Sequence, residues 1–326
     1  MMKHPRGFYD WKHDMPESLA GRLRFEVTQT LRSVYADEAL VNEIDTLYLP
    51  FANWLSGKVS LKQGPLVVGL GGPQGCGKTT FCRVISRILN KGFGLNSVVV
   101  SLDDLYSTHK DRLKYANSTH SLFSTRGVPG THDMSLAQSV FARLKSLKQG
   151  EVMRVPAFDK SLDDRKPVNL WSEVQGPIDV VLFEGWCVGA FSLGETIDKP
   201  INRLEQDKDP EGTWRRAVDE HLHGDYKALF DLIDIQMWMQ SPSYDVVYEW
   251  RNKQERMLED HLYDIHGGVL DTLDIKIMSP EALKGFMQYY ERLTRYLLAV
   301  MPERSDVLFS LDQHQKVKQL RFPIEH

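Results

Sequence analysis

The stretch Gly72-Pro73-Gln74-Gly75-Cys76-Gly77-Lys78-Thr79 satisfies the pattern G-x-x-x-x-G-K-[ST]. An apolar run at 66–70 precedes it, and a helical periodicity at 81–89 follows it. This strand, loop and helix context is the one in which the pattern binds the phosphates of a nucleotide. The sequence therefore predicts a phosphate-binding loop, and a glycine-rich turn without function is the alternative interpretation.

The residue types in this loop suit a nucleoside triphosphate and Mg²⁺. Glycines let the backbone curl, so that successive N–H groups and the helix N-terminus face the phosphates. Lys78 is expected to reach the β and γ oxygens, and the Thr79 hydroxyl is expected to coordinate Mg²⁺. We interpret Cys76 as a small loop filler. The predicted nucleotide-binding residues are Gly72, Gln74, Gly75, Cys76, Gly77, Lys78, Thr79 and Thr80.

Composition and charge exclude several other classes of protein. The net charge of the 326 residues is −4 and no dense Lys/Arg run occurs, so we expect no nucleic-acid partner. Residues 1–17 are not apolar enough for a signal peptide, and no apolar stretch approaches the ~20 residues of a membrane helix. Three cysteines without metal-ligand spacing favour reduced thiols. We expect a cytoplasmic protein without a membrane partner, and its oligomeric state stays open.

Apolar runs alternate with helical periodicities along the chain. The strand-like runs lie at 66–70, 98–102, 178–183, 233–239 and 307–311, and helical segments between them include 134–148 and 243–262. This alternation predicts an α/β fold of the P-loop NTPase type, with a doubly wound, mainly parallel sheet and helices on both faces. Residues 17–57 have helical spacing, with Pro50 expected to break or kink the second helix.

Acidic residues follow two of the predicted strands. Asp103 and Asp104 come directly after the run at 98–102, at the sheet edge where open α/β sheets bind ligands. Asp103 is the candidate general base for a hydroxyl acceptor, whereas Asp104 could equally cap the following turn. Glu184 ends the run at 178–183 as a Walker-B carboxylate does. The predicted Mg²⁺ residues are Thr79, Glu184 and Asp103.

Two polar segments with little periodicity lie between these strands. They run from Arg126 to Asp133 and from Pro156 to Arg165, and they combine cations with turn-forming residues. Arg126, Lys160 and Arg165 would suit an anionic acceptor, although each alone could be a solvated surface charge. Further along, Arg251 begins a basic helix and could close over the triphosphate as a catalytic cation. The alternative is an i,i+4 ion pair between Arg251 and Glu255.

With these motifs in place, the chain resembles the D-glycerate 3-kinase family, within the wider group of uridine kinase, phosphoribulokinase and pantothenate kinase. The matching segments are 48–55, 72–80, 101–106, 126–133, 156–161 and 183–186. The resemblance implies Lys78 and Thr79 at the phosphates and Mg²⁺, Asp103 as base and Glu184 near the metal. It also implies that four residues surround the acceptor, namely His132, Asp159, Lys160 and Arg165. The complete predicted acceptor set is Asp104, Tyr106, Arg126, His132, Asp159, Lys160 and Arg165.

Two segments depart from the family's pattern. Residues 191–225 are unusual for the group, and the Asp-Arg stretch after Lys160 is shorter than the glycine-containing version of the plant kinases. Both departures could reshape the acceptor pocket. We expect two parts in the chain, a helical extension at 1–62 and a kinase domain at 63–326 that carries acceptor-binding insertions and a lid helix.

The expected activity is that of an ATP-dependent kinase acting on a small hydroxy acid, with D-glycerate as the expected acceptor and Mg²⁺ as cofactor. Pantothenate, uridine or a sugar phosphate are alternative acceptors, and a non-catalytic nucleotide-binding regulator is an alternative class. A GTPase is disfavoured, because the N-K-x-D-like stretch at 252–255 lies in a predicted helix and precedes the D-x-x-G at 264–267. We find no transport-ATPase signature.

Overall fold

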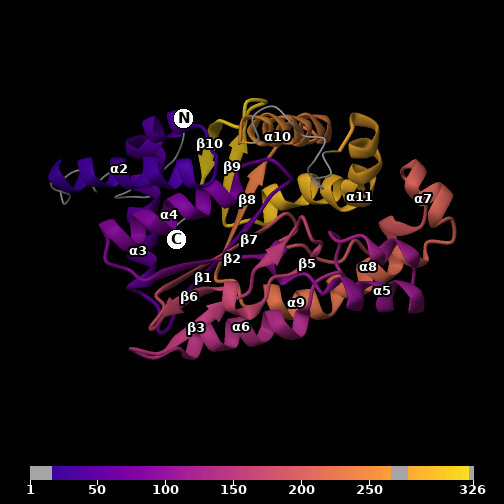
Figure 1. Cartoon of the computed structure of the whole chain (residues 1–326), viewed down its shortest axis with the longest axis horizontal. Coiled ribbons are helices and arrows are strands. Elements are labelled where there is room, and N and C mark those ends of the chain that lie inside the picture. The colour runs from indigo at the N-terminus through magenta and orange to yellow at the C-terminus, as the bar shows by residue number, and fades with distance from the viewer. Residues whose placement is uncertain (1–16, 266–277, 323–326) are drawn as a thin grey trace.

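The computed structural model describes residues 17–265 and 278–322 (Figure 1). The first sixteen residues of the predicted extension lie outside the described residues, as do the last two residues of the D-x-x-G stretch. One large sheet organises the fold, with strand order β10-β9-β8-β1-β7-β2. Its strands are β1 (Leu66–Gly71), β2 (Ser97–Ser101), β7 (Val180–Gly185), β8 (Ile235–Gln240), β9 (Val307–Leu311) and β10 (Val317–Arg321).

The predicted fold class is confirmed. All five strand-like runs of the sequence form strands, and their neighbours in the sheet pair in parallel. β10 pairs antiparallel with β9 and was not predicted. Three of its five residues, Lys318, Gln319 and Arg321, are polar and exposed, as suits the edge of a sheet, so it lacks the apolar run of the central strands.

Helices cover both faces of the sheet (Figure 1). Along β1, Val67 packs into one apolar cluster, while Leu66, Val68 and Leu70 pack into the other, because successive side chains of a strand point to opposite faces. The second cluster holds α2 (Glu17–Ser33), α3 (Leu49–Val59) and α4 (Lys78–Gly92). The first cluster holds α6 (Met134–Ser146), α8 (Thr213–His223), α9 (Asp225–Phe230) and α11 (Pro280–Arg304).

The remaining elements lie around the ends of the strands. α5 (His109–Ser118) follows β2, and α10 (Tyr244–Ile265) follows β8. Two small antiparallel pairs lie outside the large sheet, β3 (Val152–Val155) with β6 (Ser172–Gln175), and β4 (Phe158–Asp159) with β5 (Asp164–Arg165). The stretch 252–255 lies inside α10, as the sequence predicts. Across the described part of the chain, no helix is both long and apolar enough to cross a membrane.

The described part of the predicted N-terminal extension packs directly on the large sheet. Pro50 lies in the first turn of α3, where its missing N–H costs no helical hydrogen bond, and a π-helical turn at Ile44–Tyr48 precedes it. Phe51 is fully buried, with its ring centroid 5.3 Å from that of Phe81 and 5.5 Å from that of Phe309. The helices therefore complete the core on this face.

The unusual segment 191–225 contains α7 (Arg203–Lys208) and the whole of α8. Buried ion pairs hold it in place. Arg215 pairs with Asp209 inside the segment at 3.3 Å, and Glu205 pairs with Arg292 of α11 at 2.6 Å. Breaking such a buried pair would leave an uncompensated charge. The Glu205–Arg292 pair therefore holds the segment against α11.

We expect Phe51→Ala to lower the free energy of unfolding by about 3–5 kcal/mol, because it removes a buried ring and leaves a cavity between α3 and the sheet. Chemical denaturation of both proteins measures the change. Phe25→Ala, which removes a ring of α2 that is 63% exposed, is the matched control and should be nearly neutral. Equal losses of unfolding free energy in the two variants would contradict a core shared by α3 and the sheet.

Candidate active site

The phosphate-binding loop joins β1 to α4 as predicted. Gly75 and Gly77 have φ values of 79° and 94°, in the left-handed region where a side chain is strained. The buried Lys78 ammonium donates to the carbonyl oxygens of Gly72 at 2.7 Å and Pro73 at 2.9 Å, so it lies folded over the loop. The loop thus presents a cation and the N-terminus of a 15-residue helix on one side of the sheet edge.

Glu184 lies at the C-terminal end of β7, beside the loop. Its carboxylate accepts a hydrogen bond from the Thr79 hydroxyl at 2.9 Å, and its strand position pairs with Ser101 of β2. Burial raises the pKa of Glu184, and the nearby Lys78 ammonium opposes that rise. Thr79 and Glu184, both predicted as Mg²⁺ residues, are therefore in direct contact.

Asp103 lies in a short 3-10 turn, Leu102–Leu105, directly after β2. Its carboxylate accepts from the Lys160 ammonium at 2.6 Å and from the Tyr106 hydroxyl at 3.2 Å. Burial alone would raise the pKa of Asp103, but the attraction of Lys160 outweighs it and lowers the pKa to about 2. Asp103 is thus ionised at neutral pH, and Lys160 reaches it from β4–β5, a hairpin more than fifty residues away in sequence.

Asp104 has a different environment from its neighbour. Its carboxylate accepts from the backbone N–H of Phe158 at 3.0 Å, which ties the 3-10 turn to the start of β4. Burial raises the pKa of Asp104. The structure therefore gives Asp104 a turn-fixing contact and leaves Asp103 as the carboxylate paired with a cation.

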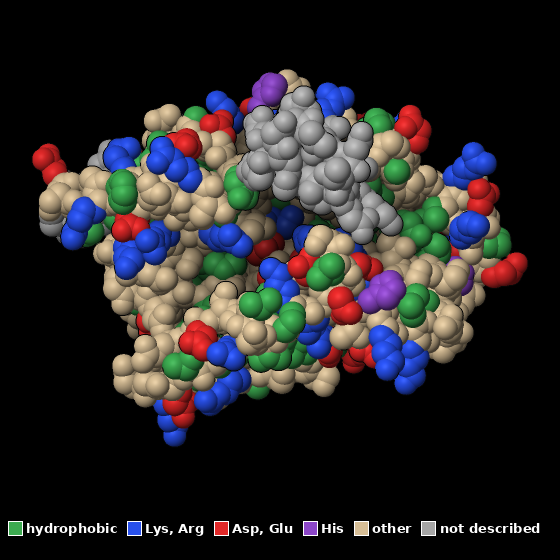
Figure 2. Space-filling view, in the orientation of Figure 1, with side chains coloured by type: hydrophobic (Ala, Val, Ile, Leu, Met, Phe, Trp, Pro, Cys, Tyr) green, Lys and Arg blue, Asp and Glu red, His purple; other side chains and the backbone are tan. Residues whose placement is uncertain are grey.

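A cavity of about 990 Å³ connects these groups. The space-filling view shows cationic and acidic side chains meeting in a hollow near the centre of the molecule (Figure 2). The predicted site residues that line the cavity are Gln74, Gly75, Lys78, Thr79, Asp103, Asp104, Tyr106, Arg126, Lys160, Glu184 and Arg251. Residues from the phosphate loop, the ends of β2 and β7, the segment before α6, the β4–β5 hairpin and α10 therefore converge on one space.

Three predicted acceptor residues are not among the residues that line this cavity. Arg165 donates to Asp133 at 2.8 Å and to the Tyr106 carbonyl at 3.1 Å, and Asp159 accepts from the backbone and side chain of Ser161. The ring of His132 is stacked on that of Tyr106, with 4.3 Å between their centroids. These residues make contacts within the segments that carry the lining residues Tyr106 and Lys160.

His132 is buried, and its Nδ1 lies 2.5 Å from the Tyr226 hydroxyl. Burial lowers the pKa of His132 to about 3, so the ring is neutral at neutral pH. Its Nε2 has no hydrogen-bond partner within the described residues. A neutral ring packed against Tyr106 fixes the aromatic side of the wall, and Tyr106 in turn donates to Asp103.

Two of the arginines that line the cavity, Arg126 and Arg251, each have a carboxylate partner. Arg126 pairs with Asp163, and one of its N–H groups donates to the Lys160 carbonyl at 3.2 Å. Arg251 forms the i,i+4 ion pair with Glu255 that the sequence left open, and it still lines the cavity. Both guanidiniums are therefore oriented, and both face the space between the loop and the hairpin.

Sequence patterns missed the contribution of α11 to the site. Tyr290 lies in the middle of this helix, and its hydroxyl donates to the Arg126 carbonyl at 3.2 Å. Its ring also packs edge-on against Trp186, the residue two places after Glu184, and the Trp186 indole donates to the Gly127 carbonyl at 3.0 Å. A Cβ at Gly127 would overlap the Tyr290 hydroxyl, so the glycine is required for this approach. Only the tertiary fold brings these segments together.

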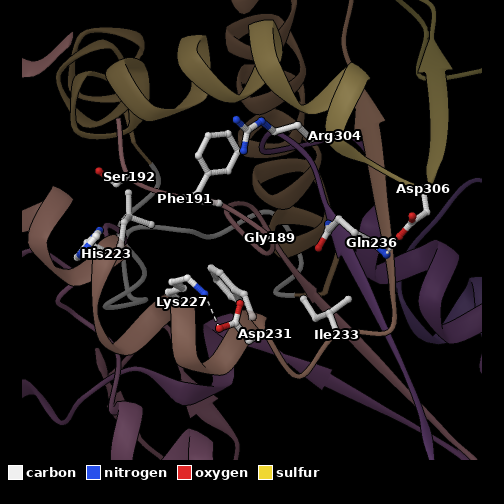
Figure 3. A pocket seen from close by; sticks show the side chains of 13 residues that line it. Gly189, Phe191, Ser192, His223, Lys227, Asp231, Ile233, Gln236, Arg304 and Asp306 are labelled. Atoms are coloured by element: carbon white, nitrogen blue, oxygen red, sulfur yellow. Dashed lines mark hydrogen bonds and ion pairs between the residues drawn. The ribbon is translucent and has the colours of Figure 1, made fainter. Parts of the chain in front are cut away.

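A second cavity, of about 420 Å³, lies elsewhere and contains none of the predicted site residues. Its lining comes from the loop after β7, α8, α9, the start of β8 and the end of α11 (Figure 3). The Arg304 guanidinium lies 3.9 Å from the centre of the Phe191 ring, and Lys227 pairs with Asp231 at 2.6 Å. The carboxylates that line this cavity balance its cations in number. The cavity therefore lacks the excess positive charge that a triphosphate would need.

The large cavity fits a nucleotide with Mg²⁺. Both polar atoms of the Gln74 side-chain amide are buried and lack a partner among the described residues, which leaves them available to a ligand. No group of three or more His, Cys, Asp or Glu side chains within 17–265 and 278–322 could hold a metal by itself. Mg²⁺ commonly binds through one or two carboxylates together with substrate phosphates, and Thr79 with Glu184 offers that arrangement.

Fold and cavity together define a P-loop kinase as the class of this protein. The Phosphoribulokinase / Uridine kinase family model matches residues 67–191. A kinase of Schizosaccharomyces pombe described as uncharacterized is 32% identical over 228 residues, a match that covers 66% of this chain and 78% of that protein. The chain belongs to this kinase family.

Two relatives carry a more specific name. The chloroplastic D-glycerate 3-kinase of Arabidopsis thaliana is 34% identical over 226 residues, which cover 64% of this chain and 47% of that protein. The chain thus matches about half the length of that relative. A solved D-glycerate 3-kinase from Cryptococcus neoformans superimposes with a TM-score of 0.65 at 26% identity, covering 83% of this chain and 98% of that one.

We expect Lys78→Ala to lower kcat by roughly 10²-fold or more, because the ammonium that lies over the loop can no longer stabilise charge on the transferred phosphoryl group. Steady-state kinetics with Mg-ATP measure the loss, and circular dichroism checks the fold. Lys91→Ala, an exposed lysine of the same helix, is the control and should keep wild-type kcat. Unchanged turnover in Lys78→Ala would exclude this loop as the phosphate site.

Proposed function

We propose that this chain is an ATP-dependent kinase that transfers the γ-phosphoryl group of ATP to a hydroxyl of D-glycerate, giving 3-phosphoglycerate. The single observation that carries the proposal is the Asp103–Lys160 pair, which places an ionised carboxylate and an ammonium group beside the phosphate loop in one cavity. The names of the two D-glycerate 3-kinase relatives support the identity of the acceptor.

The roles follow from charge and position. The phosphate loop and Lys78 would hold the triphosphate, with Thr79 and Glu184 as the residues that would hold Mg²⁺. When bound, Mg²⁺ would neutralise charge on the β- and γ-phosphates. Arg251 faces the same space and would add a second positive charge next to the phosphates.

The acceptor end of the cavity would recognise a small carboxylate. Lys160 is on the surface hairpin, with a side chain that is 62% exposed, so it can turn from Asp103 toward an incoming anion. Arg126 adds a guanidinium held from behind by Asp163, and a guanidinium matches a carboxylate with two parallel hydrogen bonds. Aromatic rings also line the cavity, as a uridine-type kinase would need, but the cations Lys160 and Arg126 beside Asp103 favour an acceptor that carries a negative charge.

Asp103 would take the proton of the acceptor hydroxyl. As the hydroxyl oxygen bonds to the γ-phosphorus, the bond from phosphorus to the ADP oxygen breaks, and the hydroxyl proton passes to the Asp103 carboxylate. Arg165, Asp159 and His132 would act indirectly by holding the loops that carry Tyr106 and Lys160. Cys76, Cys82 and Cys187 are all buried free thiols, which suits the cytoplasmic location that we propose.

The direct test is a panel of acceptors with Mg-ATP: D-glycerate, L-glycerate, pantothenate, uridine and ribulose 5-phosphate. Phosphorus NMR of the products identifies the phosphorylated hydroxyl, and D-glycerate is expected to give a new phosphomonoester. Turnover with a different acceptor would show that D-glycerate is not the substrate, but it would still support kinase activity. Nucleotide binding without ADP release for any acceptor would instead favour a regulatory protein.

We predict that Asp103→Asn lowers kcat by roughly 10²- to 10⁴-fold with little change in ATP affinity, since the amide keeps the shape of the side chain but cannot accept the proton. Asp104→Asn is the matched comparison and should be milder, because that carboxylate contacts the Phe158 N–H instead. Steady-state kinetics and nucleotide titration measure both. A larger kcat loss in Asp104→Asn would reverse the assignment.

We predict that Lys160→Met raises the acceptor KM more than the ATP KM, because it removes the cation nearest the base. The pH profile should change as well. Without the ammonium, burial dominates and the pKa of Asp103 rises from about 2, so the base becomes protonated, and activity falls, at a higher pH than in the wild type. Lys145→Met, on the exposed face of α6, is the control. If activity falls at the same acidic pH in Lys160→Met as in the wild type, Lys160 does not lower the pKa of Asp103.

A further inference from the structure

The turn between β9 and β10 reaches across to the phosphate loop. In this turn the Gln315 side-chain amide donates a hydrogen bond from Nε2 to the backbone carbonyl of Gly75, at the tip of the loop. The two residues are 240 positions apart in sequence. Gln315 is half-buried, and none of the sequence motifs includes it. Its contact with the loop therefore needs an explanation of its own.

The backbone of Gln315 does not favour a glutamine. Its φ is 66°, in the left-handed region, and the turn closes through bonds from the Gln315 N–H to the Asp312 carbonyl at 3.1 Å and from the Asp312 N–H to the Lys316 carbonyl at 2.9 Å. Gly and Asn are the residues that adopt this conformation at least cost. The turn itself therefore does not require a Gln side chain, whereas the hydrogen bond to the Gly75 carbonyl does.

The same contact fixes the orientation of one peptide group. The Gly75 carbonyl and the Cys76 N–H belong to one planar trans peptide, so they point in opposite directions. When Gln315 holds the carbonyl on its own side, the Cys76 N–H must point away from the β9–β10 turn. Gly75, with φ of 79° and no side chain, would otherwise leave this peptide free to rotate.

A second contact braces the tip of the loop from α10. The Trp250 indole donates to the Gln313 carbonyl at 2.8 Å, so α10 and the β9–β10 turn are joined beside the loop. A Cβ built at Gly75 would lie 2.8 Å from the Trp250 Cβ, which shows how closely this helix approaches. Trp250 also precedes Arg251 in the chain, so the brace lies next to a cation that lines the cavity.

We propose that Gln315 is a positioning residue for the nucleotide phosphates. Its amide holds the Gly75–Cys76 peptide so that the Cys76 N–H faces the phosphates and contributes to the cradle of backbone donors. The residue acts through the loop and touches neither the acceptor nor the transferred group. The inference therefore depends on the phosphate loop alone and not on which acceptor the kinase uses.

The test separates a contribution to binding from one to stability. Gln315→Gly removes the amide and relieves the backbone, so we expect Tm to stay within about 3 °C of the wild-type value while the dissociation constant of Mg-ATP rises by roughly 3- to 30-fold. Gln315→Asn keeps an amide and tolerates the left-handed conformation, but it is one methylene too short to reach Gly75, so it should behave like Gln315→Gly. Gln313→Ala, in the same turn, removes an exposed side chain and should bind Mg-ATP as the wild type does.

Titration with inorganic tripolyphosphate identifies which part of the nucleotide responds. If Gln315 acts through the loop, Gln315→Gly weakens tripolyphosphate and ATP by the same factor. Wild-type ATP affinity in Gln315→Gly would overturn the proposal. A loss for ATP without a loss for tripolyphosphate would overturn it too, because it would place Gln315 against the nucleoside. If D-glycerate proves not to be the acceptor, these binding results keep their meaning.

Discussion

The meeting of parallel strand ends at one edge of the sheet is the constraint on which the site depends. β1, β7 and β2 are adjacent and run in the same direction, so the segments that follow them emerge side by side. The phosphate loop follows β1, Glu184 ends β7, and Asp103 follows β2. These three parts of the site come from distant parts of the sequence. They become neighbours because the hydrogen bonds between the strands fix the strand register.

This constraint explains why the sequence could predict that certain residues would lie together. Apolar runs mark buried parallel strands, and a polar residue just after such a run must lie at the binding edge, which placed Lys78, Glu184 and Asp103 in one cavity. The acceptor side is different, because its residues come from loops whose paths depend on packing. Arg165 and His132 have the right chemistry for an anion, yet the structure engages them with Asp133 and Tyr226.

Residues without a local signal could not be predicted at all. Tyr290 lies on a 25-residue amphipathic helix, where an aromatic residue at helical spacing indicates core packing and nothing more. Gln315 lies in a polar turn, and its contact with Gly75 exists only because β9 follows β8 in the sheet order. In both cases the contact depends on where the whole element lies in the fold. It could therefore be predicted only from the topology and not from the neighbouring residues in the sequence.

The aromatic cluster on the N-terminal helices also links distant parts of the chain. The ring of Trp54 lies 4.8 Å from that of Phe322, just beyond β10, and Phe51 packs against Phe309 of β9. These contacts span more than 250 residues, and contacts of such length close slowly because loop entropy is lost before they form. During synthesis α3 therefore has no complete partner surface until β9 and β10 have left the ribosome. The N-terminal helices, although they are made first, should complete their packing only after the rest of the sheet has been made.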